Sequence, residues 1–277
     1  MSGAFLEQMA DASRARVQAA KQRVSEAALA AQARCTPVPP ALRLEASGFD
    51  LIAELKLRSP AAGRLGASDE HAAGRAVVYA RAGAAAVSVL TEPARFDGSL
   101  ADLTHAARAL APFAVPAMRK DFLVDPYQVL EARVAGAGGV LVILRMLSRA
   151  TIGTLLDCAH AHGLFVLLEA FDAEDLDLMH ELIAAHAAST TLLAGVNCRD
   201  LTTLQVVPER LLELAPLLPA AVPRVAESGV ATDADARRVA AAGYGLVLVG
   251  SALMQAADPA ALARSLLAGG RAGRRAA

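Results

Sequence analysis

Residues 140–168 read VLVILRMLSRATIGTLLDCAHAHGLFVLL. A short apolar run, Val140–Leu144, is followed by a helix-like stretch, Arg149–His162, and then by a second apolar run, Leu164–Leu168. Two buried strands that flank a helix form a βαβ unit, in which the strands are parallel. This stretch therefore predicts a parallel sheet that is covered by helices.

The same unit recurs along most of the chain. Eight apolar runs alternate with helix-like stretches from about residue 49 onward, and eight such units close a (β/α)8 barrel, an α/β fold of about 250 residues. A doubly wound sheet is the alternative, but it usually shows Gly-x-Gly-x-x-Gly after its first strand, and Gly63-Arg-Leu-Gly66 has a different spacing. The other runs are Leu51–Leu55, Ala86–Leu90, Val115–Met118, Leu192–Val196, Val222–Ala226 and Leu246–Val249, and the other helix-like stretches are Glu70–Ala82, Gly98–Leu110, Pro126–Ala135, Asp172–His186, Pro208–Leu217, Asp233–Ala242 and Asp258–Leu267.

The two ends of the chain lie outside this repeat. An amphipathic helix is predicted over Ala4–Ala33, and the prolines at 37, 39 and 40 would end it and serve as a hinge or as a static linker. The arginines at 271, 274 and 275 lie among Gly and Ala, which is typical of a frayed terminus. We therefore expect one domain over 1–277, with a helical extension at 1–48, the barrel at 49–268 and a frayed tail at 269–277.

Composition excludes several classes of protein. The chain has 277 residues, of which 55% are hydrophobic and 20% charged, so it can bury a core and is not a disordered chain. A net charge of -1 argues against a nucleic-acid partner, and no apolar run reaches the roughly 18 residues of a membrane span. Three widely spaced cysteines fit a reducing, cytoplasmic setting. A monomer and a homodimer both remain open.

Polar residues follow the predicted strands, where barrel enzymes carry their chemistry. Glu54 and Lys56 are two apart in the first strand, so their side chains point to one face. A carboxylate inside an apolar strand costs several kcal/mol unless it is paired, and Lys56 is the obvious partner. The third run leads to Arg119, Lys120 and Asp121, the fifth leads to Glu169, and the sixth leads to Asn197 and Arg199.

The last two runs end in small polar residues. Glu227-Ser228-Gly229 and Gly250-Ser251 follow the seventh and eighth strands, where barrels often bind phosphate. Glycine lets backbone N–H groups approach phosphate oxygens, and a serine hydroxyl adds a donor. These residues predict a phosphate site at the mouth of the barrel.

Other reactive side chains do not form a second site. His160 and His162 are two apart in a helical stretch and face different ways, which makes them a poor metal pair. Cys198 points opposite to its neighbours Asn197 and Arg199, so packing is the better interpretation of this thiol than nucleophilic catalysis. We expect no metal site.

Six blocks of the sequence, in this order, resemble the signature of the indole-3-glycerol phosphate synthase family. The first is IAELKLRSP at 52–60 with Gly63, and the most distinctive is RKDFLVDPYQ at 119–128. The others are VLTE at 89–92 with Phe96 and Gly98-Ser99, GVNCRDL at 195–201, ESGV at 227–230 and LVGSALM at 248–254. Together they cover residues from about 49 to 254, and the helical extension is also similar to that of the family.

The resemblance implies an enzyme of tryptophan biosynthesis. Such a carboxy-lyase closes 1-(2-carboxyphenylamino)-1-deoxyribulose 5-phosphate to indole-3-glycerol phosphate with loss of CO2 and water, and needs no cofactor. By resemblance, Lys120 is the acid at the ribulose carbonyl, Glu169 the general base, Lys56 a second acid or carboxylate binder, and Glu54 its partner. Resemblance also assigns Ser59, Phe96, Phe122, Asn197, Arg199, Glu227 and Ser228 to substrate binding, and Gly229, Gly250 and Ser251 to the phosphate.

Five positions depart from the family pattern. Ala170-Phe171 stands where Val-His is expected after Glu169, and Ala61 replaces a common serine. Cys198 replaces the second Asn of Asn-Asn-Arg, and the segment 136–138 reads Gly-Ala-Gly instead of Gly-Ala-Asp. These changes remove no proposed catalytic group, but they leave room for a phosphate-binding paralogue that acts on a related substrate.

Overall fold

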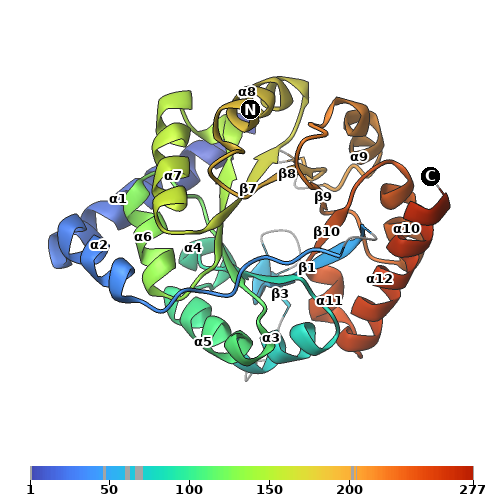
Figure 1. Cartoon of the computed structure of the whole chain (residues 1–277), viewed down its shortest axis with the longest axis horizontal. Coiled ribbons are helices and arrows are strands. Elements are labelled where there is room, and N and C mark those ends of the chain that lie inside the picture. Colours follow the sequence, from blue (N-terminus) through green and yellow to red (C-terminus); the bar gives the residue numbers. More distant parts are fainter. Residues whose placement is uncertain are drawn as a thin grey trace.

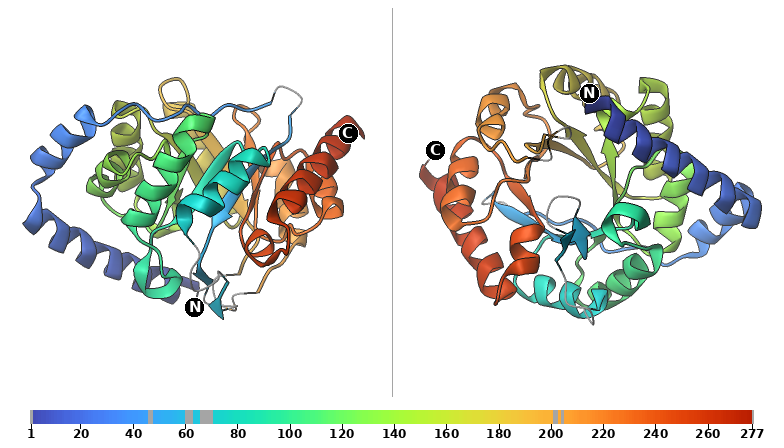
Figure 2. Two further views of the ribbon diagram at one scale, coloured as in Figure 1. Left: turned by 90° about the horizontal axis from the view of Figure 1, so that it is seen from below. Right: turned by 180° about the vertical axis from the view of Figure 1, so that it is seen from behind.

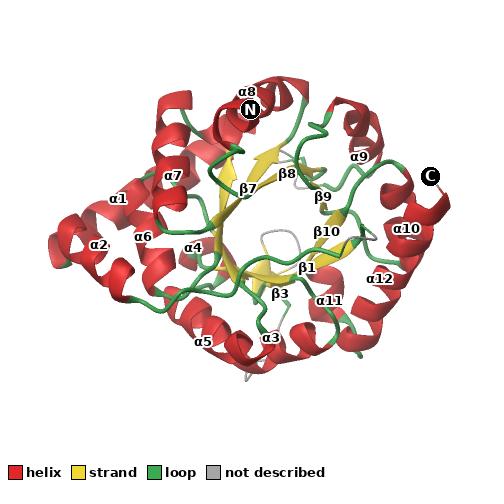
Figure 3. Ribbon diagram, in the orientation of Figure 1, coloured by secondary structure: helices red, strands yellow, loops and turns green. Residues whose placement is uncertain are grey.

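A computed structural model describes residues 2–45, 48–59, 63–65, 71–200, 203 and 205–276. Across these residues, eight parallel strands close into a barrel that is surrounded by helices (Figures 1 and 3). The predicted (β/α)8 barrel is thereby confirmed, and the doubly wound alternative is wrong. The barrel strands are β1 (Asp50–Leu55), β4 (Ala86–Leu90), β5 (Ala117–Lys120), β6 (Gly139–Ile143), β7 (Phe165–Ala170), β8 (Leu192–Asn197), β9 (Arg224–Glu227) and β10 (Leu246–Val249).

The strand order around the barrel is β1-β10-β9-β8-β7-β6-β5-β4, so each strand lies beside its neighbours in the chain. A separate antiparallel hairpin of β2 (Arg58–Ser59) and β3 (Gly63–Arg64) follows β1. The predicted third and seventh runs begin two residues early, at Val115 and Val222, because apolar residues that precede the ladder continue the same hydrophobic pattern.

Alternate residues of each strand fill the inside of the barrel. One buried cluster contains the inward-facing Ile52, Met118 and Leu167, and a second contains the outward-facing Leu51, Val166 and their neighbours, which pack under the helices. Both faces of a barrel strand are buried, which is why the runs read as continuous apolar segments.

The helices cover the outer face of the barrel. Several begin at a side-chain cap that the sequence supplies: Ser148 accepts from Thr151 N, Asp172 from Asp175 N, and Thr232 forms a capping box with Asp235. The helices around the barrel are α3 (Ala72–Arg81), α4 (Pro93–Phe96), α5 (Leu100–Leu110), α6 (Pro126–Val134), α7 (Arg149–Ala161), α8 (Ala173–His186), α9 (Glu209–Leu214), α10 (Asp233–Ala241), α11 (Ser251–Gln255) and α12 (Pro259–Ala276). No helix in this described part of the chain is long and apolar enough to cross a membrane.

The N-terminal extension is two helices, and the prediction of one helix over Ala4–Ala33 is wrong. Helix α1 (Ser2–Arg23) ends where Ser25 begins to cap α2 (Glu26–Cys35), because the Ser25 hydroxyl accepts from Ala28 N and starts a new helix. Figure 2 shows α1 running along one side of the barrel opening, at the same end as the β2–β3 hairpin.

The proline segment after α2 is bound to the barrel. Arg133 of α6 donates to the carbonyl oxygens of Thr36 and Pro37, at 2.7 and 2.9 Å. Gly138 faces Pro39 and the carbonyl oxygen of Pro40, where a Cβ would come within 3.0 Å of that oxygen. These contacts favour the static linker over the hinge.

The C-terminus is helical rather than frayed. Helix α12 continues to Ala276, and its glycines at 269, 270 and 273 are buried against α10 and Phe49. Glycine is a poor helix former, and for this reason the sequence favours an unstructured tail from residue 269. In α12, glycine instead lets the helix pack closely against its neighbours, because a Cβ on Gly270 would lie 1.9 Å from the ring of Phe49.

Substitution of Gly270 tests this packing. Gly270→Ala should lower the free energy of unfolding, because overpacking costs about 1–3 kcal/mol or more and outweighs the gain of about 1 kcal/mol in helix propensity. Gly153→Ala is the matched control, because Gly153 also lies inside a helix and an added Cβ there would have no neighbouring atom within 4 Å. Urea denaturation should show the control more stable than wild type, and equal effects at both sites would contradict the packing.

Candidate active site

A layer of charged side chains closes the barrel interior at the carboxyl ends of the strands. Glu54 of β1, Lys120 of β5, Glu169 of β7 and Glu227 of β9 all face inward above the apolar layers. The side chains of the three glutamates are 1–4% exposed, and that of Lys120 is 15% exposed. Charges this deeply buried must be paired to be tolerated.

Lys120 is the centre of this layer. Its Nζ donates to Glu169 Oε2 at 3.0 Å and to Glu227 Oε2 at 3.2 Å. Burial by itself would lower the pKa of Lys120, but the nearby carboxylates of Glu169, Glu227 and Glu54 outweigh it and hold the pKa above its ordinary value. The side chain is therefore an ammonium ion that is kept charged and aimed into the barrel mouth.

Glu54 and Lys56 form the ion pair that their spacing predicts. Lys56 Nζ lies 3.2 Å from Glu54 Oε1, and both side chains are largely buried. Among the described residues, the second oxygen of Glu54 has no hydrogen-bond partner. The carboxylate fits because β10 is followed directly by Gly250, where a Cβ would lie 2.3 Å from Glu54 Oε1.

Glu227 is held in a similar way against β8. A Cβ on Gly195 would lie 2.3 Å from Glu227 Oε1, and this oxygen has no hydrogen-bond partner among the described residues. Burial and the neighbouring Glu169 raise the pKa of Glu227 well above its ordinary value, although Lys120 opposes the shift. The site therefore contains one carboxyl group that holds a proton more strongly than a free glutamate does.

The turn after Glu227 is strained and closely packed. Ser228 and Gly229 both have positive φ values, of 66° and 71°. A non-glycine residue in this conformation is uncommon and persists where its surroundings determine it, often at functional sites. A Cβ on Gly229 would meet Cys198 Sγ at 2.8 Å, so this turn lies directly on the buried thiol.

Aromatic side chains form one wall above the charged layer. Phe122 stands between Phe5 of α1, with ring centroids 6.0 Å apart, and Phe96 of α4, at 6.2 Å. Phe171 joins the same buried cluster, and the guanidinium of Arg145 lies over its ring at 4.7 Å from the centroid. The wall gives the cavity an apolar side that suits an aromatic ring.

These side chains surround a cavity of about 390 Å³, within the range of small-molecule sites. Every residue to which the family resemblance gives a role lines this cavity: Glu54, Lys56, Ser59, Phe96, Lys120, Phe122, Glu169, Asn197, Arg199, Glu227, Ser228, Gly229, Gly250 and Ser251.

The grouping of Arg119 with Lys120 at the mouth is wrong. The side chain of Arg119 lies outside the barrel, where it donates to Thr91 Oγ1 and to the carbonyl oxygen of Gln128 and pairs with Asp121 and Glu131. In a strand, neighbours point to opposite faces, so Arg119 and Lys120 could not both enter the mouth. Asp121 lies at the edge of the cavity but is bound to Arg119.

The cavity also contains residues that the sequence analysis missed. Phe5 and Leu6 come from the extension, and their place over the mouth has no local signal in the sequence. Leu141 and Ile143 do have one, because they alternate within the run Val140–Leu144 and share its inward face.

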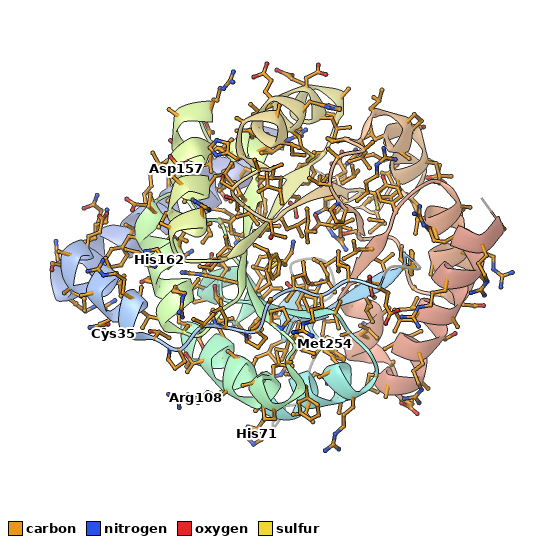
Figure 4. All side chains as sticks on the ribbon, viewed as in Figure 1. Cys35, His71, Arg108, Asp157, His162 and Met254 are labelled. Atoms are coloured by element: carbon orange, nitrogen blue, oxygen red, sulfur yellow. The ribbon has the colours of Figure 1, made fainter. Side chains whose placement is uncertain are left out.

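Cys198 is fully buried in the core, and burial raises its pKa to about 11, which agrees with a packing role. His162, at the end of α7, and Cys35, at the end of α2, lie on the periphery, away from the barrel mouth (Figure 4). Ala61, one of the departures from the family pattern, lies outside the described residues.

Comparison with known proteins places this chain in a family. Residues 6–266 match the family model for indole-3-glycerol phosphate synthase. The chain belongs to the indole-3-glycerol phosphate synthase family. A synthase of that name from Parafrankia sp. (strain EAN1pec) is 41% identical over 267 residues, which are 96% of each chain. One from Mycobacteroides abscessus is 38% identical and covers 97% of this chain and 96% of its own.

Family members also occur inside longer proteins. The multifunctional tryptophan biosynthesis protein of Schizosaccharomyces pombe is 42% identical over 227 residues, which are 81% of this chain and 29% of that protein. Among solved structures, 3-hexulose-6-phosphate synthase from Salmonella typhimurium matches with a TM-score of 0.58 at 17% identity, covering 80% of this chain and 98% of its own. This second likeness concerns the barrel fold alone.

The raised pKa of Glu227 gives a test by stability. The folded state holds the proton of Glu227 more tightly than the unfolded chain does. This proton therefore makes its full contribution to the free energy of unfolding below the ordinary glutamate pKa, and the contribution is lost as the pH rises through the raised pKa. Glu227→Gln keeps the neutral shape, so it should raise the free energy of unfolding at pH 8 by roughly 0.5–2 kcal/mol, with a smaller gain near pH 5.

Urea denaturation at the two pH values measures this difference. Glu213→Gln, on the exposed side of α9, is the matched control and should change neither value. A Glu227→Gln protein that is less stable than wild type at pH 8 would show that the carboxylate stabilises the fold.

Proposed function

We propose that this chain closes 1-(2-carboxyphenylamino)-1-deoxyribulose 5-phosphate to indole-3-glycerol phosphate, with loss of CO2 and water. The observation that carries the proposal is the Lys120 ammonium, held at 3.0 Å from Glu169 in a cavity with one charged and one aromatic side. Ring closure needs a proton donor at a carbonyl beside an aromatic ring, and membership in the family supports this pairing.

Lys120 acts in the first step. The ring carbon that bears the carboxylate attacks the ribulose carbonyl, and the oxygen gains negative charge as the carbon–carbon bond forms. The Lys120 ammonium stabilises that charge and gives its proton to the oxygen. The carboxylate then leaves as CO2, and its bonding electrons restore the aromatic ring.

Glu169 and Lys56 act in the loss of water. Glu169 takes a proton from the ring carbon between the nitrogen and the carbon that bears the hydroxyl, and the electrons of that C–H bond form the new carbon–carbon double bond as the hydroxyl leaves. Lys56 protonates the departing hydroxyl, and its ion pair with Glu54 at 3.2 Å holds the amine in position for this role. The pairing of two lysines with separate carboxylates supports separate acids for the two steps.

The rest of the cavity orients the two ends of the substrate. Ser59, Phe96, Phe122, Asn197 and Arg199 receive the carboxyphenyl end, where apolar rings suit the benzene ring and a guanidinium suits a carboxylate. Glu227 and Ser228 lie beside the reacting ring. Gly229, Gly250 and Ser251 bind the phosphate through backbone N–H groups and a hydroxyl.

We also infer a cytoplasmic enzyme with no nucleic-acid partner, active as a monomer or a homodimer without a cofactor. Three separate free thiols and a net charge of -1 support this setting. A paralogue with a related substrate is the second candidate, because Phe171 replaces the usual histidine in the wall of the cavity and Cys198 replaces an asparagine under its strained turn.

Lys120→Ala should lower turnover by about 100-fold or more, because it removes the proton donor. Arg95→Ala is the control, since Arg95 is exposed on α4 and lies outside the lining of the cavity. The measurement is the fluorescence of indole-3-glycerol phosphate formed from the carboxyphenylamino substrate by each purified protein.

Two results would count against the proposal. Turnover that survives both substitutions would remove Lys120 as the acid. No turnover by the folded wild-type protein would favour the paralogue, and Phe171→His would then be the first change to assay.

A further inference from the structure

Helix α1 touches the barrel mouth through two polar side chains, Ser13 and Arg16, one turn apart. Ser13 is fully buried, and its hydroxyl donates to the carbonyl oxygen of Phe122 at 2.5 Å and accepts from Gln128 Nε2 at 2.8 Å. Arg16 reaches past Ser13 to the carboxylates that follow β4 and β5. A buried polar contact with all its hydrogen bonds made fixes the register of the helix on the barrel.

Arg16 bridges two buried carboxylates. Its Nη2 donates to Asp121 Oδ1 at 2.8 Å, and its Nη1 lies 3.5 Å from Glu92 Oε1. The side chains of Glu92 and Asp121 are 0% and 1% exposed. Burial alone would raise the pKa of Asp121, but Arg119 and Arg16 outweigh it and lower the value, so the aspartate stays charged and holds Arg16.

The same two carboxylates set the positions of the aromatic wall. Asp121 Oδ1 also accepts from Phe122 N at 2.8 Å. Glu92 caps α4 by accepting from Ala94 N and Arg95 N, and Phe96 is the last residue of that helix. Phe96 and Phe122, two of the aromatic residues of the wall, are thus both tied to side chains that bind Arg16.

Another aromatic residue of the wall comes from α1 itself. Phe5 packs against Phe122, and Leu6 beside it lines the cavity. Phe5 lies eleven residues before Arg16 on one continuous helix, which is about 16 Å at 1.5 Å per residue. The ion pairs of Arg16 therefore hold the middle of a helix whose N-terminal part forms part of the cavity wall.

We propose that Arg16 is a positioning residue that sets the aromatic side of the substrate site. It holds Phe5, Phe96 and Phe122 at the spacing that receives a carboxyphenyl ring, and it acts on the phosphate side only weakly, because that side is built from the ends of β9 and β10. This inference rests on the proposed function for the identity of the ring, but the contacts that it invokes belong to the chain alone.

The test compares Arg16→Gln with Arg14→Gln. Arg14 lies on the same helix and pairs with the exposed Asp11, so its variant controls for loss of a charge on α1. Isothermal calorimetry measures binding of two separate probes, 2-(methylamino)benzoate and inorganic phosphate, and the indole fluorescence assay measures kcat and KM.

For Arg16→Gln we expect the dissociation constant of the aminobenzoate and the KM of the substrate to rise roughly tenfold, in the range of coupling between sites. The dissociation constant of phosphate and the value of kcat should stay close to wild type. Arg16→Lys should recover part of the loss, because one ammonium replaces a fork that reaches two carboxylates. Arg14→Gln should match wild type.

Ser13→Ala keeps the inference testable if Arg16→Gln does not fold, because it removes the adjacent bond to Phe122 and should weaken aminobenzoate binding in the same direction. Equal weakening of both probes would show a general structural role and overturn the proposal, as would unchanged aminobenzoate binding. If wild type binds the aminobenzoate but turns over no substrate, the proposed function fails, while the calorimetric comparison still decides the role of Arg16.

Discussion

An ammonium ion held between carboxylates inside a barrel dominates the design of this molecule. Lys120, Glu169 and Glu227 are stable there only as a group, because each charge alone would cost several kcal/mol to bury. Their neighbours fit around them: Gly195 and Gly250 leave space for carboxylate oxygens, and the aliphatic layers below exclude water from the lower side. The same exclusion strengthens every electrostatic interaction with a bound molecule.

The side chains of the site are held in position in two different ways. Strand ends carry the charged groups, and their positions are fixed by the hydrogen-bonded ladder of the barrel. Phe5 lies on the N-terminal extension, Phe96 on the short helix α4 and Phe122 just after β5, and the positions of all three depend on the ion pairs and the cap at Glu92 and Asp121. The charged groups thus lie on the barrel itself, whereas part of the aromatic wall lies on segments that are attached to it.

The barrel and its charged residues could be predicted because both have local signals. Apolar runs at regular intervals define the strands, and Glu54 stands out as a charge inside such a run. The prediction for Arg119 is wrong because it considers charge without the alternation of faces that separates Arg119 from Lys120. Phe5 and Leu6 could not be found because their role depends on where a distant helix packs. The final turns of α12 could not be found because close packing, and not propensity, selects glycine there.

The three thiols differ in their surroundings. Cys198 lies in the core and Cys158 is half-buried, and burial raises the pKa of each to about 11, so neither ionises readily near neutral pH. Cys35 is exposed at the end of α2. A maleimide dye should therefore attach to one point of the native protein, on the extension and far from the reacting groups, and would report movement of that extension without any engineered cysteine.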